Sequence, residues 1–439
     1  MEKQHLAAAE RCLAFINESV TAFHAVENVE RKLREKGFIE LKESDDWDIL
    51  PGEGYFVKRN DSSLLAFRMP AGAAKGFHIA ASHSDSPCFK LKAGEETLVE
   101  KSYVKLNVEP YGGMIHATWF DRCLSVAGRI VCREKNQLVS KTVNIDEDLL
   151  VIPNLAIHLD REMNKNLSYN PQIDLQPLLS ARPSGKDASS EETSEDPSHI
   201  LMRKIAACAE VDESDILGKD LFLYVRDKGR LAGAEKELML SPRLDDLECV
   251  FASVEGFLSA DPGEYISILA VFDNEEVGSH TKQGAASTFL KDTLERVGES
   301  LGKSASGYRR MLAESFMISA DNAHGVHPNH PEKSDSAAKP YLNQGIVIKF
   351  HGGQKYTTDG YSEAVMRDIC EKAQVPCQSY CNRSDIAGGS TLGNISAGQV
   401  SIPTVDIGLA QLAMHSAVET AGSLDVEYLI RALTIFYAQ

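Results

Sequence analysis

The feature that most constrains the fold is a set of short apolar segments that each end in histidine or acidic residues. Phe77 to Ala81 is apolar nearly throughout and runs directly into a loop that holds His83 and Asp85. Ile266 to Phe272 is equally apolar and also ends at acidic residues. A strand without a polar face is typical of a sheet that is covered on both faces, as parallel sheets flanked by helices are. The pattern therefore predicts an α/β fold.

The rest of the chain beyond residue 240 repeats this order of strand, loop and helix. Strands are also predicted in the following segments: Leu64 to Met69, Phe316 to Ser319, Ile346 to Phe350 and Thr404 to Ile407. Helices are predicted after Asp245, Tyr361 and Ser423, and two more at the beginning of the chain, where Gly37 is placed to end the second. Such alternation indicates a mixed central sheet flanked by helices.

Residues 92 to 235 have a different hydrophobic pattern. Short alternating segments such as Val104 to Val108, separated by turn residues, are typical of antiparallel strands. We therefore expect one α/β domain in two pieces, residues 1–91 and 236–439, interrupted by an inserted β-rich domain at 92–235. Inside the insert, Arg182 to His199 holds five Ser and five Asp or Glu but no aromatic residue, which predicts a mobile loop.

The charge and cysteine content exclude several classes of protein. Lys and Arg number 46 against 64 Asp and Glu, and this net charge of −18 repels a nucleic-acid backbone. No uncharged apolar run reaches the roughly 18 residues of a membrane span, and the first thirty residues lack the pattern of a signal peptide. The nine cysteines are scattered from Cys12 to Cys381, which indicates free thiols in a reducing cytoplasm. We interpret Cys370, Cys377 and Cys381 as packing thiols.

The polar residues at the strand ends are of metal-ligand type and include no thiolate. They are His83, Asp85, Asp245, Glu275, Glu276, Asp321 and His415. Taken singly, a Glu-Glu pair is usually solvated and a lone histidine usually structural. However, an unpaired acid buried after an apolar strand costs several kcal/mol, and the coincidence of several such places favours a bound cation. Imidazole and carboxylate ligands suit zinc, cobalt or manganese.

Two ions would give this set a chemical use. If Asp245 bridges them, His415 with one of the adjacent glutamates completes one site, and His83 with Asp321 completes the other. Ions about 3.5–4 Å apart polarise a carbonyl and lower the pKa of a shared water to near 7. Of Glu275 and Glu276, one would ligate and the other would act as general base. Spacing leaves open which glutamate does which.

Six segments of the chain occur in the order found in a known family. They are HSDSP (His83 to Pro87), RLDDL (Arg243 to Leu247), DNEEVGS (Asp273 to Ser279), SADNAHGVHPN (Ser319 to Asn329), RSDIAGGSTLG (Arg383 to Gly393) and QLAMHS (Gln411 to Ser416). Together they resemble the aspartyl aminopeptidases of peptidase family M18, over nearly the whole chain. The resemblance implies the metal ligands His83, Asp245, Glu276, Asp321 and His415, with Asp245 as the bridge. It further implies that Glu275 is the general base and that Asp85 orients His83.

The resemblance also implies specificity and assembly. Family members act on N-terminal Asp or Glu, and Lys349 in GIVIKF matches the partner of that side-chain carboxylate. Tyr356 and Asp385 match pocket positions, and His158 is similar to a histidine that the inserted domain sends into a neighbouring subunit's active site to assist the substrate carbonyl. The implied assembly is a tetrahedral dodecamer built from dimers. One departure is Asp246, where the family commonly has asparagine.

We therefore expect a cytoplasmic aminopeptidase that binds two divalent ions per subunit, zinc first and cobalt or manganese otherwise. Its partners would be peptides with an acidic N-terminal residue and further copies of itself. We expect it to bind neither nucleic acid nor membranes. The alternatives are a related aminopeptidase or deacylase of different substrate preference, and a non-catalytic oligomeric scaffold.

Overall fold

The computed structural model describes residues 3–165, 168–181 and 199–439, and the described chain forms two compact units. The first comprises residues 1–86, 229–414 and 419–439, and the second comprises 87–228 and 415–418. The expected boundaries at 91/92 and 235/236 lie a few residues from these, but the expectation did not include the short segment 415–418. Residues 182–198 of the predicted mobile loop lie outside the described residues, and His199 is the N-cap of a helix.

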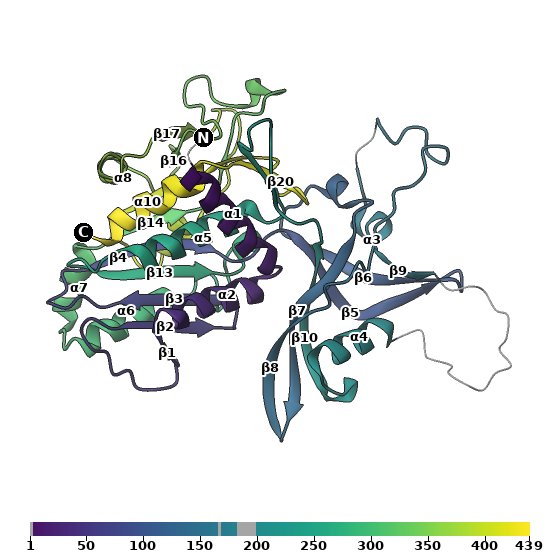
Figure 1. The fold of residues 1–439 in the computed structure, drawn as a ribbon, viewed down its shortest axis with the longest axis horizontal. Helices are drawn as coiled ribbons and strands as arrows, with labels where there is room; N and C mark the ends of the chain where they lie inside the picture. Colours follow the sequence, from purple (N-terminus) through teal and green to yellow (C-terminus); the bar gives the residue numbers. More distant parts are fainter. Residues whose placement is uncertain (1–2, 166–167, 182–198) are drawn as a thin grey trace. The chain divides into compact units, whose positions relative to one another are not determined.

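The helices and strands of the first unit follow the strand-loop-helix order expected from the sequence (Figure 1). They are α1 (Lys3–Glu18), α2 (Ala22–Glu35), β1 (Ile39–Leu41), β2 (Gly54–Arg59), β3 (Ser63–Arg68), β4 (Phe77–His83), β11 (Arg230–Ala232), β12 (Leu238–Ser241), α5 (Leu244–Ser259), β13 (Ile266–Phe272), the 3₁₀ helix η4 (Glu275–Val277), α6 (Phe289–Ser300), α7 (Ala305–Ala313), β14 (Phe316–Ala320), β15 (Ala323–His324), η5 (Pro331–Lys333), β16 (Ile346–Phe350), α8 (Gly360–Ala373), β17 (Cys377–Cys381), α9 (Leu392–Ala397), β18 (Thr404–Gly408), β19 (Ala410–Leu412), β20 (Glu419–Gly422) and α10 (Asp425–Tyr437).

The main sheet of the first unit confirms the mixed α/β expectation. Within the described residues it has nine strands in the order β1-β2-β3-β13-β4-β14-β18-β16-β17. The central run β13, β4, β14 and β18 is parallel, and β3 and β16 join it in antiparallel pairs. A second sheet of the same unit has the order β11-β12-β20-β19-β15.

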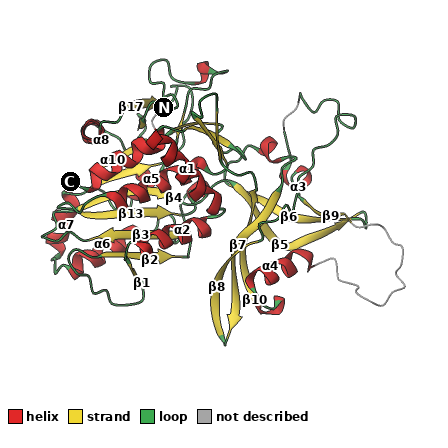
Figure 2. Ribbon diagram, viewed as in Figure 1, coloured by secondary structure: helices red, strands yellow, loops and turns green. Residues whose placement is uncertain are grey.

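Helices cover both faces of the main sheet, which explains why its central strands are apolar throughout (Figure 2). Along β4, Ala80 packs into the cluster that contains α1, α2, α5, α8 and α10, whereas Ile79 and Ala81 pack into the cluster that contains α6, α7 and α9. Successive side chains of a strand point to opposite faces, so both sets must be apolar. At the end of α2, Gly37 takes φ +82° and its N–H reaches Arg34 O at 3.0 Å, as expected for a residue that ends a helix.

The second unit is a β-rich domain with its own core. Its elements are β5 (Cys88–Val99), β6 (Tyr103–Tyr111), the 3₁₀ helix η1 (His116–Trp119), β7 (Leu124–Glu134), β8 (Gln137–Asn144), α3 (Pro171–Asp174), β9 (Leu178–Ala181), α4 (Ile200–Ala209), η3 (Glu213–Asp215) and β10 (Ile216–Val225). The strands pair antiparallel in the order β8-β7-β10-β5-β6-β9. Phe89, Trp119 and Leu201 of α4 lie in its core. Among the described helices of both units, none combines the length and the apolar character needed to cross a bilayer.

Candidate metal centre and active site

The candidate site lies where the parallel strands of the main sheet end. His83 is the last residue of β4, and it pairs in register with Phe272, the last residue of β13. Asp321 directly follows β14, the other neighbour of β4. Because parallel strands end at the same edge of a sheet, these side chains meet there, as ligand sites do in open α/β sheets.

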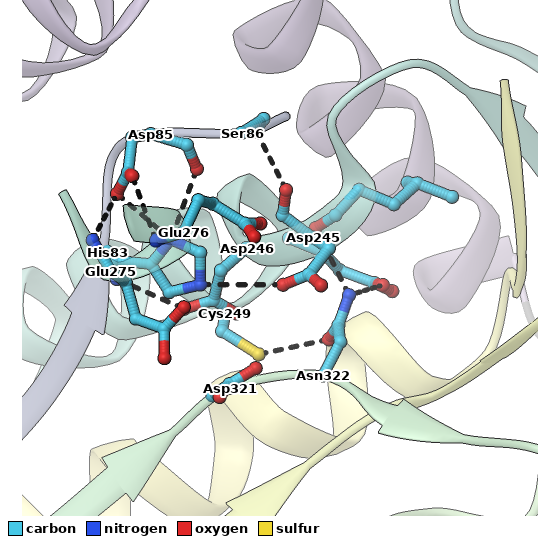
Figure 3. A network of polar contacts seen from close by, with 12 residues as sticks. His83, Asp85, Ser86, Asp245, Asp246, Cys249, Glu275, Glu276, Asp321 and Asn322 are labelled. Carbon is cyan, nitrogen blue, oxygen red and sulfur yellow. Dashed lines mark hydrogen bonds and ion pairs between the residues drawn. The ribbon is translucent and has the colours of Figure 1, made fainter. Parts of the chain in front are cut away.

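Two further elements bring acids to the same edge (Figure 3). Glu275 and Glu276 begin η4, three residues after β13, and Asp245 and Asp246 lie in the first turn of α5. One group of possible metal ligands is fully buried and consists of His83, Asp245, Asp246 and Asp321. A second group consists of His83, Glu275 and Glu276. Within each group the ligand atoms lie within 4.8 Å of one another. The structure therefore places these side chains from separate elements close together at one edge of the sheet.

Asp85 connects the histidine to the glutamates. Its carboxylate oxygens accept the backbone N–H groups of Glu275 and Glu276, each at 3.1 Å. Its own backbone oxygen lies 3.1 Å from His83 Nδ1, and its Oδ1 lies 3.3 Å from the same nitrogen. A proton on Nδ1 satisfies these acceptors, and Nε2 is the ring nitrogen that faces Asp245 Oδ1, 3.5 Å away.

Asp246 is the residue that spacing alone did not single out as part of the cluster. It is fully buried, and its Oδ2 accepts the backbone N–H of His83 at 3.1 Å. Asn322, which follows Asp321, donates to Leu244 O at 3.1 Å and so ties the end of β14 to the beginning of α5. The only sequence signal for Asp246 was its place directly after Asp245, together with the asparagine that the family usually has there.

Burial and mutual repulsion shift the pKa values of these acids. Desolvation raises the pKa of Glu275 to about 7, and the charge of Asp321 adds to the increase. Desolvation likewise raises the pKa values of Glu276 and Asp246 well above their usual range. Burial disfavours protonation of His83, but the surrounding carboxylates, Asp246 foremost, outweigh it and raise its pKa. The cluster thus holds more negative charge than its own groups neutralise.

Lys349 on β16 supplies a cation at the margin of the cluster. It is 2% exposed, its Nζ lies 3.7 Å from Asp321 Oδ2, and the same nitrogen lies 5.5 Å from the centre of the Tyr356 ring. Burial lowers the pKa of Lys349, but Asp321 and the other ionisable groups around it together raise it more, so that the net shift is upward and the amine stays charged. Tyr356 is also buried, so two of the predicted pocket residues, Lys349 and Tyr356, lie beside each other.

Three predicted residues remain, Asp385, His158 and His415. Asp385 is exposed, and its carboxylate pairs with Arg383 at 2.7 and 2.9 Å. His158 is exposed in a turn of the second unit. His415, between β19 and β20, belongs to the second unit by its contacts, and its Nδ1 lies 2.8 Å from Gly113 O.

The donor set fits a divalent metal ion. Among the described residues, Oδ1 of Asp246 and Oε1 of the neighbouring Glu248 are buried and have no hydrogen-bond partner, in a region already rich in carboxylates. A buried carboxylate oxygen that lacks a partner is costly, and a nearby cation would relieve this cost. Carboxylate oxygens with one imidazole nitrogen match the preferences of zinc and its first-row neighbours.

A doubly covered α/β sheet with acids and histidine converging at the carboxyl edge of its parallel strands defines the class of α/β metallohydrolases. Comparison with known proteins narrows the class. The profile of the family described as "Aminopeptidase I zinc metalloprotease (M18)" matches residues 15–437. The chain belongs to this M18 family, and it is a metalloaminopeptidase.

Related proteins and solved structures match this chain over nearly its whole length. A Clostridium acetobutylicum protein named "Probable M18 family aminopeptidase 2" is 46% identical over 439 residues, 99% of each chain. "Aspartyl aminopeptidase 1" of Schizosaccharomyces pombe is 38% identical, over 98% of this chain and 95% of its own. The structure described as "Cryo-EM structure of the Ape4 and Nbr1 complex" matches with a TM-score of 0.94 at 36% identity, over 100% of this chain and 87% of that one. "Structure of S. cerevesiae mApe1 dodecamer" matches with a TM-score of 0.85 at 26% identity, over 99% and 97%.

Proposed function

We propose that this aminopeptidase removes N-terminal Asp and Glu from peptides with the help of two divalent ions, zinc first and cobalt or manganese otherwise. The observation that carries the acidic preference is Lys349, a buried cation beside the metal cluster. A buried amine that keeps its charge is a costly feature, and a carboxylate on the substrate would be a suitable partner for it. The relative named as an aspartyl aminopeptidase supports the same preference.

The proposed metal ligands are His83, Asp245, Glu276, Asp321 and His415, with Asp245 between the two ions. His415 lies four residues before Glu419, whose carboxylate accepts the N–H of Asp245 at 3.1 Å, so chain connectivity limits its distance from the acids. When bound, the ions would polarise the scissile carbonyl and lower the pKa of a water to near 7.

The protein's own groups would carry the proton and hold the substrate. Glu275, with a pKa of about 7, would take a proton from the attacking water and return it to the leaving amine. Asp85 would hold the His83 ring and the turn at Glu275 in position through the contacts described above. Lys349 and Tyr356 would line the pocket for the acidic side chain, and we keep Asp385 as a further pocket residue. His158 of a neighbouring subunit would donate to the developing oxyanion.

We also propose a homo-oligomer in which the second unit provides contacts between copies. The structural neighbour described as a dodecamer supports this assembly. We propose that the dodecamer is built from dimers, as the family resemblance implies. A cytoplasmic location is proposed because the nine cysteines are free thiols, as in reducing compartments.

The test of specificity compares Lys349→Met with the wild type on aspartyl, glutamyl, leucyl and N-acylated substrates. Loss of a buried charge partner costs about 2–5 kcal/mol, so the ratio of kcat/KM for aspartyl over leucyl substrate should fall by about 30-fold or more. Leucyl turnover serves as the internal control for damage to Asp321, and Lys372→Met, an exposed lysine paired with Asp368, controls for the loss of one charge. An unchanged ratio would favour an aminopeptidase or deacylase of different preference.

A further inference from the structure

Two cysteines and an arginine meet away from the metal centre, where α8 contacts the edge strand β17. Cys370 lies in the last turn of α8 and is 2% exposed, whereas Cys377 begins β17 and is half-buried. Cys377 packs against the apolar cluster that contains Cys370, and the two thiols are close enough for each to shift the pKa of the other. Arg367, one turn earlier on α8, places its Nη1 3.4 Å from the same sulfur.

Local structure holds these three side chains together. Helix α8 ends in a tight turn, in which Gln374 takes φ 54° and the N–H of Val375 donates to Cys370 O at 3.0 Å. The chain therefore reverses and returns alongside the helix. Arg367 is fixed by two further bonds, from Nε to Glu363 Oε1 at 2.9 Å and from Nη2 to Ser379 Oγ at 3.0 Å.

The arrangement gives the two sulfurs opposite characters. The thiol of Cys370 and the charge of Arg367 lower the pKa of Cys377 to about 6, so that it is mainly thiolate at neutral pH. The nearby Cys377 and burial raise the pKa of Cys370, which stays protonated. A partly exposed thiolate beside a protonated thiol is the usual arrangement of a reactive cysteine with its resolving partner.

We propose that Cys377 and Cys370 form a redox-modification site in which Cys377 is oxidised by hydrogen peroxide and Cys370 then closes a disulfide with it. The Cys377 thiolate attacks one peroxide oxygen, the O–O bond breaks, and hydroxide leaves and takes up a proton to become water. The sulfur of Cys370 then attacks the resulting sulfenic acid, and the hydroxyl leaves with the Cys370 proton as a second water. Two thiols lose two electrons in all, and one peroxide is reduced to two waters.

Cys381 provides a matched control within the same strand. It lies four residues after Cys377 and is also half-buried, but desolvation raises its pKa. Alkylation of the native protein by iodoacetamide from pH 5 to 9, resolved by peptide mass spectrometry, compares the two. Cys377 should show a midpoint near pH 6 and, at that pH, react about 10-fold faster than a thiol of ordinary pKa, after allowance for the weaker nucleophilicity of a low-pKa thiolate.

Three variants separate the effects of Arg367 and Cys370 on the pKa of Cys377. Arg367→Gln and Cys370→Ala should each move the midpoint of Cys377 upward, whereas Cys370→Ser keeps a donor and should leave it low. After treatment with peroxide, the wild type should contain a disulfide between residues 370 and 377, seen as a mass loss of two hydrogens that dithiothreitol reverses. The Cys370→Ser variant should instead accumulate a sulfenic acid at Cys377, which dimedone traps. The proposal is overturned if Cys377 and Cys381 share one pH profile, or if peroxide forms no link between 370 and 377.

Discussion

At the scale of single residues, Glu275 and Glu276 are neighbours whose surroundings differ. The pKa of Glu275 is raised to about 7, whereas that of Glu276 is raised well above its usual range by burial and, among the charges, chiefly by Asp245. Both keep their backbone positions through Asp85. The sequence alone left open which glutamate ligates, and this asymmetry supports Glu275 as the base.

Glu275→Gln should therefore lower kcat by about 10²–10⁴-fold while zinc content stays at the wild-type level. The amide keeps the volume and the backbone N–H that Asp85 accepts, but it cannot take a proton. Kinetics and metal analysis of the same preparation check this result, and Glu276→Gln should instead lose metal. Turnover within tenfold of the wild type would remove Glu275 as the base, and a wild type without any turnover would favour the scaffold alternative.

Asp425 predicts a pH dependence of stability that does not involve the metal cluster. It is fully buried, desolvation raises its pKa to about 7, and its oxygens accept the N–H groups of Asn343 and Gly345. In the unfolded chain its pKa is about 3.9. Between about pH 4 and 7 the folded state keeps a proton that the unfolded state has lost, so the free energy of unfolding falls as pH rises, by up to about 1.4 kcal/mol per pH unit.

Urea unfolding in excess chelator, from pH 4.5 to 7.5, checks this dependence against Asp425→Asn. The stability advantage of the wild type over the variant should shrink as pH rises, because asparagine cannot ionise. Parallel pH profiles for the two proteins would contradict the assignment.

At the scale of elements, the apolar segments from Phe77 and Ile266 became the central strands β4 and β13 with few changes at their ends. A strand that is covered on both faces can be recognised in the sequence, because nearly every one of its residues must be apolar. How close two neighbouring strands approach is not visible in the sequence. Gly408, at the end of β18, is one such place, since an added Cβ would lie 2.0 Å from Asp321 O.

Gly408→Ala should therefore push Asp321 out of place, lower the free energy of unfolding by about 1–3 kcal/mol and weaken zinc binding. Gly352→Ala is the matched control, because an added Cβ there meets nothing within 4 Å. Denaturant unfolding and zinc titration of both variants check the prediction. Equal stability and zinc affinity in the two variants would contradict it.

At the scale of the whole molecule, the proposed oligomer makes a prediction that a monomer cannot fulfil. Glu275→Gln and His158→Ala should each abolish most activity alone. In oligomers assembled from both variants, sites that combine an intact Glu275 with His158 of a neighbour reappear, and random mixing should restore about a quarter of wild-type turnover. Co-expression with two affinity tags and assay of the doubly purified protein checks this, and no recovery in a mixed oligomer would place His158 outside the active site.

The sequence by itself determined the α/β class, the strand ends that carry the acids and histidines, and the family. Each of these depends on a few adjacent residues or on segments in a recognisable order, so it can be read locally. Only the tertiary structure decided that the buried Asp246 accepts the backbone N–H of His83, that Lys349 lies beside Asp321, and that Cys370 lies near Cys377. These contacts depend on strand order and on the removal of water around charged groups, and both arise only when distant segments pack together.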